Sequence, residues 1–91
     1  MRMAERSVSR KVKGGKLVKI TVRSEGGRIS EVRITGDFFA HPEEGLEQVE
    51  RELRGATVSE VRKTVESATG GVTLVGLKRE DIIEMVEECL E

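Results

Sequence analysis

Ile29-Ser-Glu-Val-Arg-Ile-Thr-Gly-Asp-Phe-Phe39 is the stretch of sequence that decides the fold of this chain. Val32 and Ile34 alternate with polar residues, which is the period-two pattern of a strand with one buried face. The Gly-Asp pair that follows favours a turn and ends the strand. Two phenylalanines come directly after the turn, and they are the only aromatic residues of the chain. The stretch therefore predicts a strand that ends by presenting two large apolar rings.

Phe38 and Phe39 are expected to have different surroundings, because adjacent residues of an extended chain point to opposite sides. If the turn preserves the alternation that ends at Ile34, Phe38 lies inside and Phe39 outside. Two interpretations of the pair remain open. Both rings can fill the core where sheet and helices meet, or at least one can contact a partner, since exposed aromatic residues are frequent anchors of interfaces.

The preceding sequence predicts further strands. Residues 17–23 show the same alternation of apolar and polar residues, and Gly26-Gly27 provides a tight connection to the strand that starts near Arg28. This arrangement is typical of an antiparallel hairpin. Residues 1–12 are polar and basic, and they form either a flexible arm or an edge strand. We assign residues 13–91 to a single domain.

The sequence after the aromatic pair has helical periodicity and predicts three helices. Pro42 suits the first turn of a helix whose apolar residues extend to Leu53. Thr57 and Glu60 form a capping-box pattern at the start of the second helix. Lys78 is the expected N-cap of the third. Strands followed by helices indicate an α+β fold, in which a small antiparallel sheet is covered on one face by three helices.

Composition and charge limit the classes of function. The chain has 91 residues, of which 36% are charged, and no apolar run long enough to cross a membrane. We therefore expect a cytoplasmic protein without a membrane partner. Residues 1–36 contain ten Lys or Arg and three Glu, whereas residues 37–91 contain six Lys or Arg and fourteen Asp or Glu. Either a basic sheet face approaches phosphate or an acidic partner, or acidic helices neutralise the sheet locally. The basic part lacks interleaved aromatic residues, so nucleic-acid binding is not expected.

The residues that could carry chemistry do not form a recognisable site. Gly14-Gly15-Lys16 lacks the upstream glycine and the following Ser or Thr of a phosphate-binding loop. His41 has no nucleophile in a recognisable arrangement, and Cys89 lies on the apolar stripe of the last helix. No Cys/His cluster has the spacing of metal ligands. The sequence predicts no catalytic residue, no cofactor-binding residue and no metal ligand in this chain.

Three segments carry a resemblance to a known family. Gly14-Gly15-Lys16-Leu17, the hairpin that ends in Ile34-Thr-Gly-Asp-Phe-Phe39, and Val75-Gly-Leu-Lys-Arg-Glu-Asp-Ile82 together resemble the C-terminal accessory domain of lipoate–protein ligases. The likeness extends roughly from Lys13 to Leu90. The Gly-Asp-Phe-Phe turn is its most specific element.

The resemblance implies a function that the residues alone do not show. In that family a large domain binds lipoate and ATP, forms lipoyl-adenylate and transfers the lipoyl group to a lysine of a carrier domain, while the small domain closes on the large one. A separate chain of this kind is expected to be the non-catalytic small subunit of a heterodimeric ligase, with ATP and lipoate on the catalytic subunit and with lipoyl carrier domains reached through the complex. The expected partner interface contains Gly15, Lys16, Asp37, Phe38 and Phe39. The alternative is an adaptor or homodimeric interaction module that is unrelated to lipoylation.

Overall fold

The first three strands form one antiparallel sheet in the order β1–β2–β3, as the computed structural model shows for residues 3–12, 14 and 16–91. The strands are long and equal, and a bulge interrupts the β2–β3 register between Arg23 and Ser24. In chain order the elements are β1 (Met3–Lys11), β2 (Leu17–Glu25), β3 (Arg28–Gly36), β4 (Phe39–His41), α1 (Gly45–Glu52), the 3-10 turn η1 (Val58–Glu60), α2 (Val61–Ala68), β5 (Thr73–Val75) and α3 (Arg79–Cys89).

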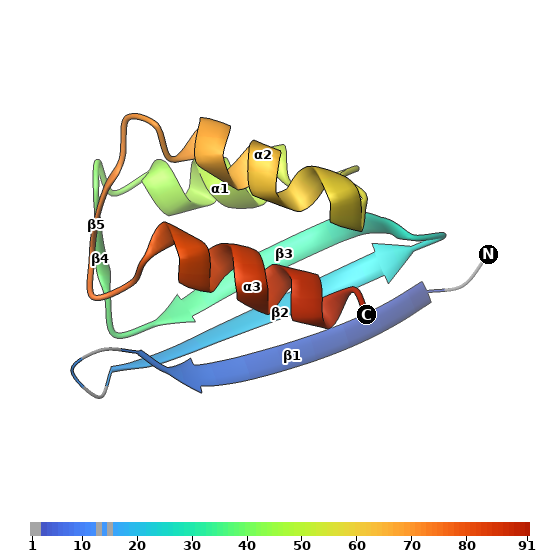
Figure 1. Ribbon diagram of the computed structural model, residues 1–91, viewed down its shortest axis with the longest axis horizontal. Coiled ribbons are helices and arrows are strands. Elements are labelled where there is room, and N and C mark those ends of the chain that lie inside the picture. The colour runs from blue at the N-terminus through green and yellow to red at the C-terminus, as the bar shows by residue number, and fades with distance from the viewer. Residues whose placement is uncertain (1–2, 13, 15) are drawn as a thin grey trace.

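The three helices lie on one face of this sheet (Figure 1). Helix α3 lies across β1 and β2, α1 packs along β3, and α2 packs against both other helices. The alternation predicted for β2 holds, because its inner residues are at most 1% exposed and meet the apolar stripes of the helices. The core-forming side chains of β2 and the helices include Val18, Ile20, Val22, Val49, Leu53, Val61, Val65, Ile82, Ile83 and Val86. The predicted α+β fold with one covered sheet face is confirmed.

Strand β1 is fastened to α3 by charged side chains. The Arg10 guanidinium lies 2.8 Å from the Glu84 carboxylate, 3.5 Å from that of Asp81 and 3.9 Å from that of Glu88. Four residues earlier on the same strand, Arg6 donates a hydrogen bond to the main-chain oxygen of Glu91 at 2.7 Å. The N-terminal segment, for which the sequence left an arm or an edge strand open, is therefore an edge strand of the sheet from residue 3 onward.

Helix starts follow the predicted capping residues in two of three cases. The Thr57 amide donates to the Glu60 carboxylate at 2.9 Å, and the Lys78 amide donates to that of Asp81 at 3.1 Å. These carboxylates occupy the reciprocal position of a capping box and lie near the positive end of the helix dipole. The chain after Thr57 first forms the 3-10 turn η1 before α2 begins.

The prediction that Pro42 lies in the first turn of a helix is wrong. Helix α1 begins at Gly45, with Glu44 as N-cap, and the Gly45 amide donates to the Pro42 carbonyl in a preceding turn. The residues before the proline form β4, which pairs with β5 to make a second, two-stranded sheet. A residue that precedes proline favours extended backbone, so His41 fits the end of a strand better than the approach to a helix.

Candidate partner interface

An apolar ridge stands at one end of the molecule, on the small β4–β5 sheet. Phe39 lies directly opposite Val75 in this ladder, so their side chains project from the same side. The two residues are 73% and 57% exposed. Figure 1 shows β4 and β5 at the end where β3 finishes, away from the chain termini. We call Phe39 and Val75 the apolar ridge.

The two phenylalanines divide as the strand alternation predicted. Phe38 is half-buried and packs against the hydrophobic core, whereas Phe39 is mostly exposed. The predicted placement of one ring inside and one outside is confirmed. Phe38 is less enclosed than a central core residue, because it lies at the end of the sheet rather than under a helix.

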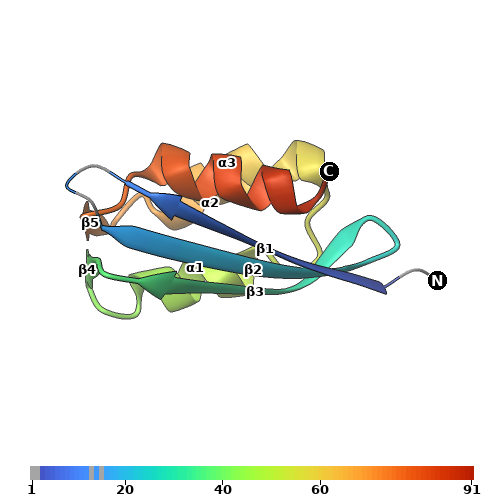
Figure 2. The same ribbon diagram turned by 90° about the horizontal axis from the view of Figure 1, so that it is seen from below.

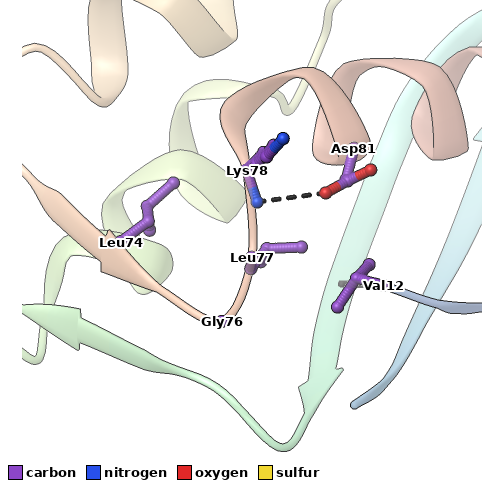
Figure 3. A pocket seen from close by; sticks show the side chains of 6 residues that line it. All are labelled: Val12, Leu74, Gly76, Leu77, Lys78 and Asp81. Carbon is purple, nitrogen blue, oxygen red and sulfur yellow. Dashed lines mark hydrogen bonds between the residues drawn. The ribbon is translucent and has the colours of Figure 1, made fainter. Parts of the chain in front are cut away.

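A pocket of about 330 Å³ opens beside the ridge (Figure 3). It lies between the end of β1, strand β5 and the start of α3. Leu77 is almost completely buried and points toward Val12, while the polar groups come from the first turn of α3. We call this the end pocket; its lining residues are Val12, Leu74, Gly76, Leu77, Lys78 and Asp81.

Backbone contacts bring most of the predicted interface residues to this end. The Asp37 amide donates to the Leu17 carbonyl at 3.1 Å, and the Val12 amide donates to the Lys16 carbonyl at 2.8 Å. A Cβ atom on Gly76 would lie 3.4 Å from the Asp37 carbonyl oxygen and 3.6 Å from Phe38, so the end pocket and the aromatic turn are in direct contact. Lys16, Asp37, Phe38 and Phe39 thus lie at the same end of the molecule. The fifth predicted residue, Gly15, lies outside the described residues.

The contribution of β5 to this surface was not predicted from the sequence. The predicted interface did not include Leu74, Val75 or Gly76. The missing information is the pairing of β4 with β5, since only that pairing places Val75 beside Phe39. An alternating apolar and polar pattern cannot be recognised in strands of three residues.

The charges around this end support both interpretations of the basic N-terminal part. Arg10 is neutralised by acidic residues of α3, as described above. In contrast, Lys11, Lys16 and Lys19 have no carboxylate within 4.0 Å among residues 3–12, 14 and 16–91. These lysines lie around Leu17, which is 49% exposed, near the end of the uncovered sheet face. Positive charge and exposed apolar surface therefore occur together.

The described residues contain no cluster of possible metal ligands. His41 is exposed on β4. Across the described ranges, no three His, Cys, Asp or Glu side chains are placed to hold a metal ion. No helix in this part of the chain is long and apolar enough to cross a membrane.

Cys89 is expected to react slowly with thiol reagents in the folded protein. Burial raises the pKa of its thiol, whose Sγ lies 3.8 Å from the Ile20 carbonyl oxygen under the sheet. The thiolate is the reactive form, so native protein at pH 8 should react with a chromogenic disulfide at least about tenfold more slowly than protein unfolded in urea. The chain has one cysteine, so the signal belongs to this residue. Equal rates would show that the helix end opens readily.

Comparison with known proteins gives three agreeing results. The family model of the bacterial lipoate protein ligase C-terminus matches residues 4–86. Lipoate-protein ligase A subunit 2 of Thermoplasma acidophilum is 33% identical over 69 residues, which cover 75% of this chain and 73% of that protein. A solved chain from an archaeal lipoylation system of the same organism, described as a bi-partite lipoate protein ligase and its E2 lipoyl domain, superposes with a TM-score of 0.84 at 29% identity. That superposition covers 93% of this chain and 97% of the solved one.

Proposed function

The chain belongs to the family of lipoate–protein ligase C-terminal domains, and from this premise we propose that it is the small accessory subunit of a ligase whose catalytic subunit is a separate polypeptide. The similarity to a protein called subunit 2, and to a chain of a bi-partite ligase, supports this assignment. The coverage also supports it, because nearly the whole of the solved chain corresponds to this one.

The observation that carries the proposal is the apolar ridge. The Phe39 ring is 73% exposed and lies directly opposite an exposed valine, so covering it with a partner removes apolar surface from water. The β4–β5 ladder already orders the main chain of both residues, which lowers the entropy cost of this contact. Aromatic residues held in this way are typical anchors of interfaces. We therefore place the contact with the catalytic subunit at the apolar ridge.

The end pocket completes this contact surface. Its floor is apolar, and it is large enough for an apolar side chain of the catalytic subunit. Lys78 at its rim, with Lys16 nearby, offers positive charge that would attract an acidic edge of the partner and raise the rate of association. Asp37 and Phe38 directly precede the ridge residue Phe39 and tie it to β2 and to the core. This arrangement gives each described residue of the predicted interface a part in docking.

The proposed role in the reaction is closure of the catalytic site. Lipoate and ATP are bound by the catalytic subunit, which forms lipoyl-adenylate and passes the lipoyl group to a lysine of a lipoyl carrier domain. A docked small subunit would exclude water from the reactive acyl-adenylate and help to fix the reacting groups. No residue of this chain is assigned a chemical step, and the chain alone is expected to bind neither ATP nor lipoate.

The test is the rate of lipoyl-adenylate formation by the catalytic subunit with and without this chain. We expect a stoichiometric amount of the chain to raise that rate at least about tenfold, which corresponds to roughly 1.4 kcal/mol of barrier. The chain alone should release no pyrophosphate from ATP and lipoate. An unchanged rate in a mixture that forms a stable complex would contradict the role in activation. Absence of any complex would favour the alternative of an unrelated interaction module.

A further inference from the structure

The two edge strands of the three-stranded sheet differ in whether their outward main-chain groups already have hydrogen-bond partners. Along β3, the Ile34 amide donates to the Glu50 carboxylate at 2.7 Å. Farther along, Ile29 donates to the Ala56 carbonyl at 2.9 Å and accepts from the Gly55 amide at 2.7 Å. Helix α1 and the loop after it therefore occupy main-chain groups near both ends of this edge, which hinders pairing with another strand.

The β1 edge is open. Figures 1 and 2 show β1 as the outermost element, with no other part of the described chain beyond it. The Val12 amide points to β2, where it donates to Lys16, and the β1–β2 register continues without a shift to Met3. Because residues of an antiparallel strand alternate in the side to which their main-chain groups point, the odd-numbered residues direct theirs to the free edge. Five successive pairing positions are thus available, namely Met3, Glu5, Ser7, Ser9 and Lys11.

We propose that β1 pairs antiparallel with β1 of a second copy of this chain, about a two-fold axis through Val8, so that two sheets join into one of six strands. In this register Glu5 lies opposite Lys11 of the other copy, and the symmetry forms this charge pair twice. Ser7 lies opposite Ser9, also twice. All these side chains are on the uncovered sheet face, while Val8 meets its own copy on the helix face. Opposite charges placed directly across an antiparallel pair stabilise it.

The alternative registers lack this complementarity. A shift by one residue would place side chains of opposite faces against each other, which a sheet with one covered face does not allow. Moving the axis to Ser7 sets Glu5 opposite Ser9 and Lys11 opposite Met3, so both charge pairs are lost. The register through Val8 does bring Arg6 opposite Arg10. Arg10 already has three carboxylates within 4.0 Å, so this contact adds a cation to an acidic cluster rather than to a lone cation.

This interface is separate from the proposed contact with the catalytic subunit. The apolar ridge lies on the β4–β5 sheet, whereas the second copy would lie along the length of β1. The inference therefore does not rest on the proposed function. If both hold, the complex contains two small subunits joined through β1 and a catalytic subunit on each.

Sedimentation equilibrium of the full chain at low salt tests the proposal. The apparent mass should rise with protein concentration from 10.1 kDa to twice that value. Glu5→Lys and Lys11→Glu should each weaken self-association at least about tenfold, because each replaces two attractive pairs by two repulsive ones. The double variant should recover an affinity within about threefold of the parent, since it restores both pairs with their signs exchanged.

A matched control and a second variant keep the test decisive. Within one chain, Arg23 lies 3.0 Å from the Glu5 carboxylate and 3.8 Å from that of Glu31. Glu31→Lys removes the second of these carboxylates, on β3 and thus away from the β1 edge, so it should leave self-association unchanged. Ser7→Pro removes a main-chain donor that points away from β2, so it should abolish the dimer while circular dichroism shows a folded protein. A mass of 10.1 kDa at about 1 mM protein, failure of the double variant to recover, or an equal effect of the control would overturn the proposal. So would a monomer in which Glu5→Lys weakens binding of the catalytic subunit, because the edge would then belong to that partner.

Discussion

Replacing Phe39 by serine is expected to weaken binding of the catalytic subunit by about thirtyfold or more, equivalent to roughly 2 kcal/mol, if the ring is a hot spot of the interface. The same change should leave the melting temperature nearly unchanged, because the side chain is already 73% exposed in the free chain. Rate stimulation should fall in parallel at subunit concentrations below the new dissociation constant. The measurements are a calorimetric titration against the catalytic subunit and a thermal melt of each variant.

Two control variants separate binding from stability. Val58→Ser removes an apolar side chain that is 48% exposed on η1, away from the ridge, and it should change neither affinity nor stability noticeably. Phe38→Ala should instead lower the free energy of unfolding by about 1–3 kcal/mol, below the 3–5 kcal/mol typical of a fully buried ring, because Phe38 is half-buried. If Phe39→Ser binds as tightly as the parent, the catalytic subunit contacts another surface.

Gly36→Ala is expected to be among the most destabilising single substitutions in the chain. Gly36 has a φ angle of +150°, a backbone conformation that residues other than glycine rarely adopt. A Cβ atom there would lie 2.3 Å from the Leu17 carbonyl oxygen and 2.9 Å from the Val18 Cα. The main chain of β2 would have to move, and the hydrogen bond from Asp37 to Leu17 would be lost. Strain and overpacking together should lower the free energy of unfolding by about 3 kcal/mol or more.

Gly27→Ala is the matched control for this substitution. Gly27 also has a positive φ, of +82, but a Cβ atom there would meet nothing within 4 Å. Gly27→Ala should lower the free energy of unfolding only by the strain of the left-handed conformation, about 1–2 kcal/mol. Urea unfolding of both variants, fitted with a common m-value, gives the difference. Equal decreases in the free energy of unfolding for the two variants would show that β2 can move away from a Cβ atom at position 36 without loss of stability.

The features that could be predicted from sequence are those encoded by neighbouring residues. Alternation over 17–23 and 29–35 gave the faces of β2 and β3, and its continuation through a two-residue turn gave the sides of Phe38 and Phe39. The capping-box pattern of Thr57 and Glu60 and the expected N-cap Lys78 marked helix starts, because capping acts within one turn. In each case the physical cause lies within a few residues of its effect.

The features that could not be predicted depend on contacts between distant segments. The β4–β5 ladder joins residues 39–41 to residues 73–75, and neither segment is long enough to show a period. The end pocket draws on the end of β1, on β5 and on the start of α3. The position of Pro42 was mistaken for the same reason, since pairing with β5 holds the preceding residues extended. Val75 of the apolar ridge and the end pocket therefore depend on contacts between segments that are far apart in the sequence.

The ion pairs between Arg10 and α3 affect when the chain can fold during its synthesis. Strand β1 is translated first among the described elements and α3 last, so the residues that Arg10 binds leave the ribosome some 70 positions after it. Until they emerge, the apolar inner face of β1 and β2 has no complete cover, and the nascent chain cannot reach its stable state. Contacts of such large sequence separation slow the final folding step and expose apolar surface in the meantime. The domain is thus expected to reach its stable fold only after helix α3 has left the ribosome and packed on β1 and β2.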